Sequence, residues 1–113
     1  MISQCEYDVF LSHNSKEKPE VIKIQKELEA QGIRTFLDLD NFTVGRNWIE
    51  ELLEIIDHKI KSAAIFYGCN GLGPIQEREI DRIRQKSFLD KNFRLIPVFL
   101  PTATEETVRN IPR

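Results

Sequence analysis

AAIFYGCNGLGP, residues 63–74, joins a continuous apolar run to a glycine-rich segment that ends in proline. The run AAIFY does not alternate apolar with polar residues, so it predicts a strand buried on both faces, as in a parallel sheet. The glycines that follow predict a loop, and Pro74 suits the first turn of a helix. The stretch therefore predicts a strand, a loop and a helix, which together form the repeating unit of α/β folds.

The rest of the chain shows the same alternation of strand-like and helical stretches. Val21, Ile24 and Leu28 recur at helical spacing, and a glycine follows where a helix C-terminus favours one. A second amphipathic stretch follows Asn47, which we expect to cap it, with Glu50 three residues on as in a capping box. We predict helices over residues 17–31, 47–60 and 74–87, and strands over residues 7–11, 33–37, 63–67 and 95–100.

This order of elements predicts an α/β fold of the flavodoxin-like kind. Its three layers comprise a central parallel sheet of strand order 2-1-3-4 and helices on both faces, joined by right-handed crossovers. Ligands of such sheets bind beyond the carboxyl ends of the strands, where the strand order reverses. We expect any site to be built from the loops there, which are Ser12–Ser15, Asp38–Asn47 and Gly68–Pro74.

Composition and charge exclude several classes of function. The chain has 113 residues, 41% of them hydrophobic and 30% charged, which suits one soluble domain with a core of its own. Its formal charge of −2 offers no basic excess for nucleic acid, and no apolar run approaches a membrane span. Cys5 and Cys69 are too few for a disulfide framework or a four-ligand zinc site. We therefore expect a cytoplasmic domain with no nucleic-acid or membrane partner.

Glu79 is the most informative polar residue. With Ile75 as the origin of a helical wheel at about 100° per residue, Ile83 falls near 80° and Glu79 near 40° on the inward face. Glu77 falls near 200° on the solvent side. A carboxylate on the inward face is costly unless it is paired or faces a polar cleft. Two interpretations fit this pattern equally well. In one, Glu79 is a site residue; in the other, it leans into water or pairs with a neighbouring arginine.

Other motifs give weaker evidence for a functional site. The loop at residues 68–74 could cradle a phosphate, but it matches neither nucleotide-binding glycine pattern and has no lysine, so a plain connection is favoured. Asp38 and Asp40 could suggest a metal or phosphoacceptor site, but a receiver domain carries its acidic residues after other strands. His13 is interpreted as a hydrogen-bonding turn residue and Cys69 as a small loop residue. No zinc-ligand spacing or catalytic triad order appears, and we expect no metal.

Three segments together resemble Toll/interleukin-receptor (TIR) domains. YDVFLSH at residues 7–13 resembles the first strand of that family, and FLD at 36–38 with VGRNW at 44–48 resembles its second strand and long BB loop. GLGPIQEREI at residues 71–80 is similar to the G-x-G-P-W-Q-x-x-E stretch of bacterial members. The resemblance covers about residues 6 to 100 in the right order. The family adds a fifth strand and a last helix, so we expect residues 1–113 to be one TIR domain excised from a larger protein.

The resemblance also implies an activity. Many TIR domains hydrolyse or cyclise NAD⁺ at the bond between nicotinamide and ribose, using one glutamate on the third helix. Spacing from the tryptophan position of the motif assigns that role to Glu79. NAD⁺ is then a substrate, and no bound cofactor is expected. The substrate-binding positions that the resemblance implies are Asn14, Ser15, Thr43 and Ile75, the last standing where the family carries an aromatic residue.

The resemblance further implies that the domain self-associates. In the family the BB loop of one protomer commonly completes the NAD⁺ site of its neighbour. Gly45 suits a loop conformation with positive φ, and Phe42 and Val44 are apolar residues on a loop that also carries charge. The residues assigned to this loop and to assembly are Asp40, Phe42, Val44, Gly45, Arg46 and Trp48.

Two functions follow from the resemblance. One is an NAD⁺ glycohydrolase or cyclase, active on self-association, that is the effector of a prokaryotic immune or defence system. The alternative is a non-catalytic module that assembles with other TIR domains and transmits a signal. Glu79 and the glycine loop favour the enzyme, while Ile75 leaves room for the module.

Overall fold

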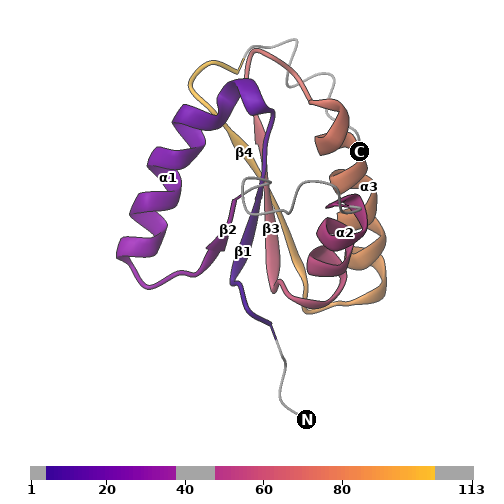
Figure 1. The fold of residues 1–113 in the computed structure, drawn as a ribbon. Helices are drawn as coiled ribbons and strands as arrows, with labels where there is room; N and C mark the ends of the chain where they lie inside the picture. The colour runs from indigo at the N-terminus through magenta and orange to yellow at the C-terminus, as the bar shows by residue number, and fades with distance from the viewer. Residues whose placement is uncertain (1–4, 38–47, 104–113) are drawn as a thin grey trace.

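The computed structural model describes residues 5–37 and 48–103 of the chain. Strands and helices alternate along it, with one 3₁₀ turn, η1, after the first strand (Figure 1). The elements are β1 (Val9–Ser12), η1 (Ser15–Glu17), α1 (Lys18–Ala30), β2 (Thr35–Phe36), α2 (Trp48–His58), β3 (Ser62–Tyr67), α3 (Pro74–Leu89) and β4 (Arg94–Phe99).

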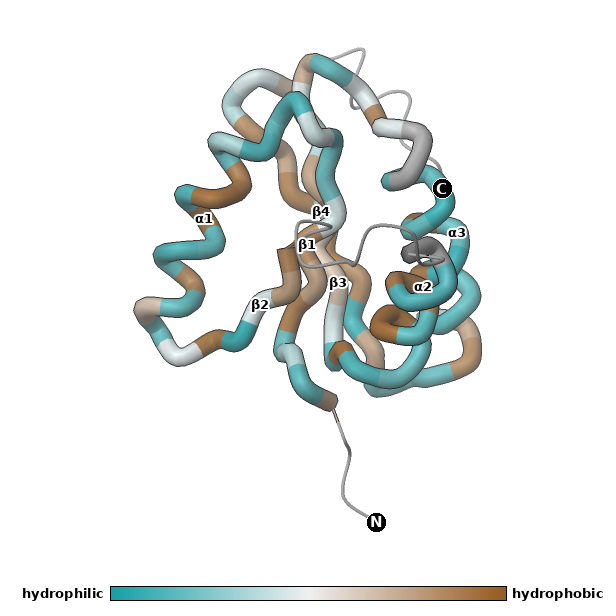
Figure 2. Tube along the Cα trace, viewed as in Figure 1, coloured by the Kyte–Doolittle hydropathy of each residue, from teal (hydrophilic) through white to brown (hydrophobic). Residues whose placement is uncertain are grey.

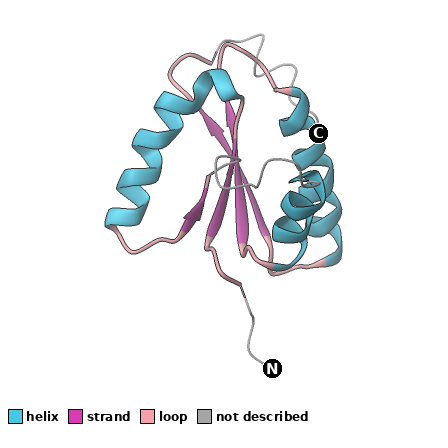
Figure 3. Ribbon diagram, viewed as in Figure 1, coloured by secondary structure: helices cyan, strands magenta, loops and turns pink. Residues whose placement is uncertain are grey.

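The four strands form one parallel sheet of order β2-β1-β3-β4. The helix α1 covers one face and the helices α2 and α3 cover the other, as Figures 1 and 3 show. This three-layer arrangement confirms the flavodoxin-like α/β fold and the strand order that the sequence predicts.

Side chains that alternate along the strands form two cores. In β1, Val9 and Leu11 join the cluster beneath α1, while Phe10 joins the cluster beneath α2 and α3. In β3, Ala64 and Phe66 likewise belong to the α1 side. Because successive side chains of a strand point to opposite faces, both faces of the central strands must be apolar. Figure 2 shows the result, with hydrophobic colour on the strands and polar colour over much of the helices.

Most element ends differ from the sequence-based predictions by one or two residues. Tyr7 makes an isolated bridge to Ile60 outside the strand, and Ile60 itself lies beyond the end of α2. The first helix begins at Lys18, because residues 15–17 form the tighter turn η1. The strand β2 is shorter than expected because the Ile33 amide donates to the Leu28 carbonyl (3.0 Å) and closes the end of α1. The capping box predicted between Asn47 and Glu50 involves a residue outside the described part.

The turn after α1 requires glycine, as expected. Gly32 has a φ of +85°, a left-handed conformation that side chains rarely adopt. Among the described residues, no helix combines the length and the apolar character needed to cross a membrane.

Candidate functional site

A polar cluster lies at the carboxyl ends of β1 and β3, the two central strands of the sheet. The chain leaves β1 toward α1 on one face and leaves β3 toward α3 on the other (Figure 1). The loops after these strands therefore lie at the point where the strand order reverses, which is the position where ligands of such folds bind. Residues 13–17 and 68–73 line this position.

Glu79 lies at the centre of the cluster, on the second turn of α3. Its side chain is 7% exposed, whereas Glu77 is exposed, as the helical wheel predicts. The hydroxyl of Ser12, the last residue of β1, donates a hydrogen bond to Glu79 Oε1 (2.8 Å). Since a buried carboxylate needs such partners, the end of β1 and the helix α3 are joined at this point. Of the alternatives that the sequence left open, a glutamate that leans into water is excluded by this burial, and Arg82 forms an ion pair with Asp57.

Gln76 holds the first turn of α3 in place and is almost fully buried, at 1% exposure. Its Nε2 donates to the carbonyl oxygens of Ser12 (3.3 Å) and Phe66 (3.1 Å), at the ends of β1 and β3. Its Oε1 accepts from the amide of Gly73 (3.2 Å). No sequence motif assigns a role to Gln76, although the same helical wheel places it about 100° from Ile75, on the inward face.

Asn14 links the loop after β1 to the loop after β3 by hydrogen bonds. Its Nδ2 donates to the carbonyl oxygens of Asn70 (3.3 Å) and Gly71 (3.2 Å), and its Oδ1 accepts from the amide of Lys16 (3.0 Å). Gly71 has a φ of +70°, so glycine is required for this turn of the loop. The side-chain amide of Asn14 is thus engaged within the protein, while Ser15 beside it is exposed.

Glu17 is a second buried carboxylate next to this loop, with 3% exposure. Its Oε1 accepts from the backbone amide (3.2 Å) and from Nδ2 (2.6 Å) of Asn70. In the sequence, Glu17 is only the predicted start of the first helix. No local pattern distinguishes it, because its partner lies 53 positions away in the chain.

An apolar layer supports the loop after β3. Tyr67, Ile65 and Ile80 form a buried cluster against which Leu72 packs, and the ring of Tyr67 stacks on that of Phe99 (centroids 5.5 Å apart). Burial raises the pKa of the Tyr67 phenol above its usual value. The loop after β3 is therefore packed, through Leu72, against apolar side chains of β3 and α3.

Several predicted site residues cannot be placed. Thr43 and the loop residues Asp40, Phe42, Val44, Gly45 and Arg46 lie outside the described residues. Trp48 begins α2 and Ile75 is the second residue of α3, but their side chains also fall outside the description. Their proposed roles remain predictions.

The remaining candidates take ordinary positions. His13 Nδ1 lies 3.0 Å from the Leu11 carbonyl oxygen, which fits its interpretation as a hydrogen-bonding turn residue, and His58 and Cys69 are exposed. Within residues 5–37 and 48–103, no group of His, Cys, Asp and Glu side chains has the proximity needed to hold a metal ion.

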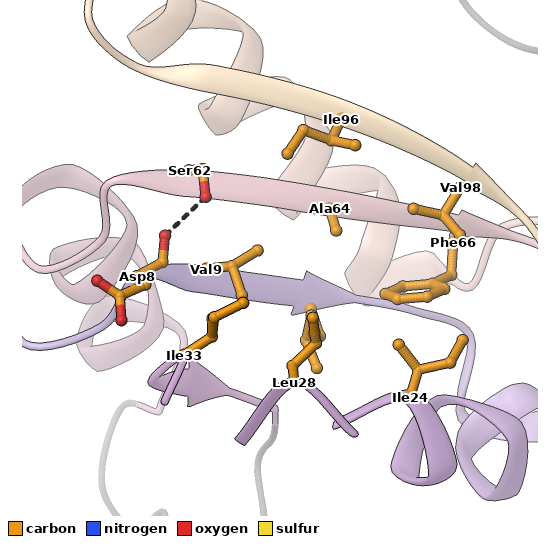
Figure 4. Close-up of a pocket in the computed structure, with 11 residues that line it drawn as sticks. Asp8, Val9, Ile24, Leu28, Ile33, Ser62, Ala64, Phe66, Ile96 and Val98 are labelled. Carbon is orange, nitrogen blue, oxygen red and sulfur yellow. Dashed lines mark hydrogen bonds between the residues drawn. The ribbon is translucent and has the colours of Figure 1, made fainter. Parts of the chain in front are cut away.

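A separate apolar groove of about 400 Å³ lies between α1 and the strands β3 and β4 (Figure 4). Ile24 and Leu28 of α1 face Ile96 and Val98 of β4 across it. Its few polar groups lie at one end, where the Ser62 hydroxyl donates to the Asp8 carbonyl (2.6 Å). The groove lies on the α1 face of the sheet, away from the Ser12–Glu79 pair, and offers no group suited to the chemistry of a nucleotide.

The parallel sheet and the polar cluster over β1 and β3 define a flavodoxin-like α/β domain with a carboxylate-bearing site at its switch point. The family model described as TIR domain matches residues 9–112, and the chain belongs to this family. This confirms the resemblance that the sequence motifs indicated. Comparison with curated proteins finds no match.

Solved structures that are similar to this chain include two structures of TIR domains. The TIR domains of the activated Roq1 resistosome directly recognizing the pathogen effector XopQ are 26% identical, with a TM-score of 0.70. That alignment covers 83% of this chain and 57% of the other, so this chain spans little more than half of its length. The TIR domain of the Toll-related receptor TRR-2 from Hydra magnipapillata is 17% identical, with a TM-score of 0.64 and coverage of 94% and 81%. At 17% identity, the similarity to the Hydra domain supports the fold alone.

Proposed function

We propose that this TIR domain cleaves the bond between nicotinamide and ribose in NAD⁺, with Glu79 as the catalytic residue. The observation that carries the proposal is the carboxylate of Glu79, which is buried at the switch point of the sheet and held by Ser12 (2.8 Å). It occupies the motif position that carries the glutamate of NAD⁺-cleaving TIR domains. Polar groups that converge at the switch point of an α/β sheet are typical of ligand sites.

The proposed chemistry suits one carboxylate. Nicotinamide leaves from a cationic pyridinium, so its departure needs no general acid, in contrast to ordinary glycosides with their two carboxylates. The protein must supply negative charge and hydroxyl contacts where the ribose gains oxocarbenium character. Glu79 would supply the charge, and the hydrogen bond from Ser12 would keep the carboxylate oriented. NAD⁺ is the substrate, and the proposal requires no bound cofactor.

The wider role that we propose is that of an effector in a prokaryotic defence system, active in the cytoplasm when copies of the domain assemble. The likeness to the TIR domains of the Roq1 resistosome, an assembly that recognizes a pathogen effector, supports assembly and defence. The number of cysteines, too low for a disulfide framework, supports the location.

The second candidate is a non-catalytic module that assembles with other TIR domains. The residue that favours it is Ile75, which stands where the family carries an aromatic ring. In that case the Ser12–Glu79 hydrogen bond would serve only to join α3 to the sheet.

The test compares Glu79→Gln with Glu77→Gln in an assay of NAD⁺ consumption and nicotinamide release on concentrated protein. A glutamine amide keeps the side-chain volume but removes the charge, so we expect turnover to fall about 10²–10³-fold in Glu79→Gln. Glu77 is exposed on the opposite side of α3 and serves as the matched control, with turnover unchanged. Thermal unfolding of both variants checks that the fold is intact.

Full activity in Glu79→Gln, or an equal loss in both variants, would refute the assignment of Glu79. A wild-type protein that consumes no NAD⁺ but assembles with other TIR domains would favour the non-catalytic module.

A further inference from the structure

The carboxylate of Glu17 is buried, yet the proposed reaction does not use it. Glu17 is the last residue of η1, and its side chain is 3% exposed. Burying a carboxylate costs free energy unless hydrogen bonds compensate for the lost water. The partners of the carboxylate therefore indicate what it does.

Both hydrogen bonds that the structure resolves for this carboxylate lead to one loop residue. Glu17 Oε1 accepts from the backbone amide of Asn70 (3.2 Å) and from its side-chain Nδ2 (2.6 Å). Hydrogen bonds to an ionised acceptor are stronger than those between neutral groups. Glu17 thus fixes both the backbone and the side chain of Asn70, in the middle of the loop between β3 and α3.

Gly68 has no side chain, and the Glu17 carboxylate occupies the space where one would begin. A Cβ atom at Gly68 would lie 2.5 Å from Glu17 Cδ and 2.6 Å from each carboxylate oxygen, which is closer than atoms can approach. The left-handed glycines of the described chain are Gly32 and Gly71, so backbone conformation does not explain glycine at position 68. Contact with Glu17 explains it.

Asn14 holds the same loop residue from its other side. The Asn70 carbonyl accepts from Asn14 Nδ2 (3.3 Å), while the Asn70 amide donates to Glu17. Two side chains of the turn after β1 therefore hold both backbone polar groups of Asn70. Ser12, at the start of this turn, holds Glu79. The loop and the carboxylate of Glu79 are thus built on one polar framework.

We propose that Glu17 is a positioning residue of the site. Its carboxylate, seated against Gly68, holds residues 68–73 in the shape that receives the substrate, and it acts through Asn70 rather than on the reacting bond. The choice of NAD⁺ as the substrate rests on the proposed function, whereas the positioning of the loop does not.

This role predicts a particular kinetic signature. A misplaced loop weakens binding of the substrate and of the transition state alike, which raises KM and leaves kcat nearly unchanged. A variant that is merely less stable has a smaller fraction of folded enzyme, which lowers the apparent kcat and leaves KM unchanged. The two measurements therefore separate positioning from a purely structural role.

The first experiment measures NAD⁺ turnover by Glu17→Ala, Glu17→Gln and the control Glu20→Ala. Removing both hydrogen bonds to Asn70 should raise KM about ten-fold in Glu17→Ala, with kcat within about two-fold of wild type. Glu17→Gln keeps an acceptor oxygen and should restore much of the affinity. Glu20 is a half-exposed α1 carboxylate that pairs with Lys23 (3.5 Å), and its variant should match wild type. A fall in kcat at unchanged KM, or no change at all, would overturn the proposal.

The second experiment uses the contact between Glu17 and Gly68. Gly68→Ala should raise KM in the wild-type background, because its Cβ would displace the carboxylate. In the Glu17→Ala background the same substitution should add little, because the colliding group is gone. Fully additive effects would contradict the proposed contact.

A third measurement does not depend on activity. Hydrogen exchange at the Asn70 amide should be faster in Glu17→Ala than in wild type or Glu20→Ala, because this amide loses its acceptor. Unchanged exchange would overturn the positioning role. A wild-type protein without NAD⁺ turnover would refute the proposed function alone.

Discussion

Ser12, Gln76 and Glu79 are polar side chains buried where β1, β3 and α3 meet. Each would be costly there without a partner, and each has one in the structure. Helical spacing alone places Glu79 and Gln76 on the inward face of α3. Their partners could not be predicted in the same way, since Ser12 lies 67 positions before Glu79 and meets it only after the sheet has formed.

The pair of Asp8 and Arg34 joins the residue before β1 to the residue before β2. The guanidinium of Arg34 donates to both carboxylate oxygens of Asp8 (3.3 and 3.1 Å), and its backbone amide donates as well (2.8 Å). These bonds lower the pKa of Asp8 from 3.8 to about 2, and the side-chain bonds contribute more than the backbone bond does. The folded protein therefore binds this proton less tightly than the unfolded chain does.

The first prediction is that Asp8 makes stability depend on pH in acid. A lowered pKa in the folded state gives stability that is fully present above 3.8 and is lost as the pH falls through about 2. We expect Asp8→Asn to unfold at lower urea concentration than wild type at neutral pH, with the difference closing over that acidic range. The difference should be modest and should shrink in high salt, because the pair is largely exposed. A difference that stays constant across the pH range would contradict the assignment.

Two basic residues of α3 form hydrogen bonds to α2 and to the turn that follows it. Arg82 forms a two-point ion pair with Asp57 (2.9 and 2.8 Å). The Lys86 ammonium donates to the carbonyl oxygens of Ile56 (2.7 Å), Asp57 (3.1 Å) and Ile60 (3.2 Å) at the end of α2. A helix C-terminus leaves carbonyl oxygens without intrahelical partners and favours a cation. Burial nevertheless lowers the pKa of Lys86, which shows that its position also has a cost.

The second prediction concerns this helix end. Lys86→Met keeps much of the length and the apolar stem of the side chain but removes every donor, so we expect it to lower the free energy of unfolding by about 1–3 kcal/mol. Lys91→Met, at an exposed position after the end of α3, is the matched control and should change stability by less than about 0.5 kcal/mol. Urea unfolding followed by circular dichroism gives both values. Equal stability of the two variants would show that the lysine bonds contribute nothing.

Strand and helix boundaries show where local patterns are insufficient. The run AAIFY forms the buried strand that its composition predicts, because it must be apolar on both faces. The second strand is shorter than its apolar pattern predicts, because the Ile33 amide bonds to the end of α1 instead of joining the sheet. A local hydrogen bond of this kind, which closes the end of a helix, leaves no mark in the apolar pattern.

At the scale of the whole molecule, apolar side chains remain on the surface of the described residues. Phe88 and Leu89 at the end of α3 are 90% and 88% exposed, and Ile96 and Phe99 of β4 are about half exposed. Within the described sheet, β4 also lies at an edge. Exposed apolar groups and a strand edge are typical of surfaces that contact other protein.

The third prediction is that activity depends on assembly. If a neighbouring copy completes the NAD⁺ site, turnover per molecule should rise with protein concentration until assembly is complete. We would measure it over a dilution of about a hundred-fold, with inert carrier protein holding the total concentration constant. Substantial turnover that stays constant on dilution would show that each chain works alone.

The amino-acid sequence by itself determined the class of fold, the order of the elements and the inward position of Glu79. These features follow from local periodicity, since apolar runs and helical spacing record which faces are buried. The tertiary structure alone decided that Ser12 holds Glu79, that Gln76 anchors α3 and that Glu17 is seated against Gly68. The physical reason is that these contacts join segments far apart in the chain. Their free energy is gained only once the sheet brings the carboxyl ends of β1 and β3 together.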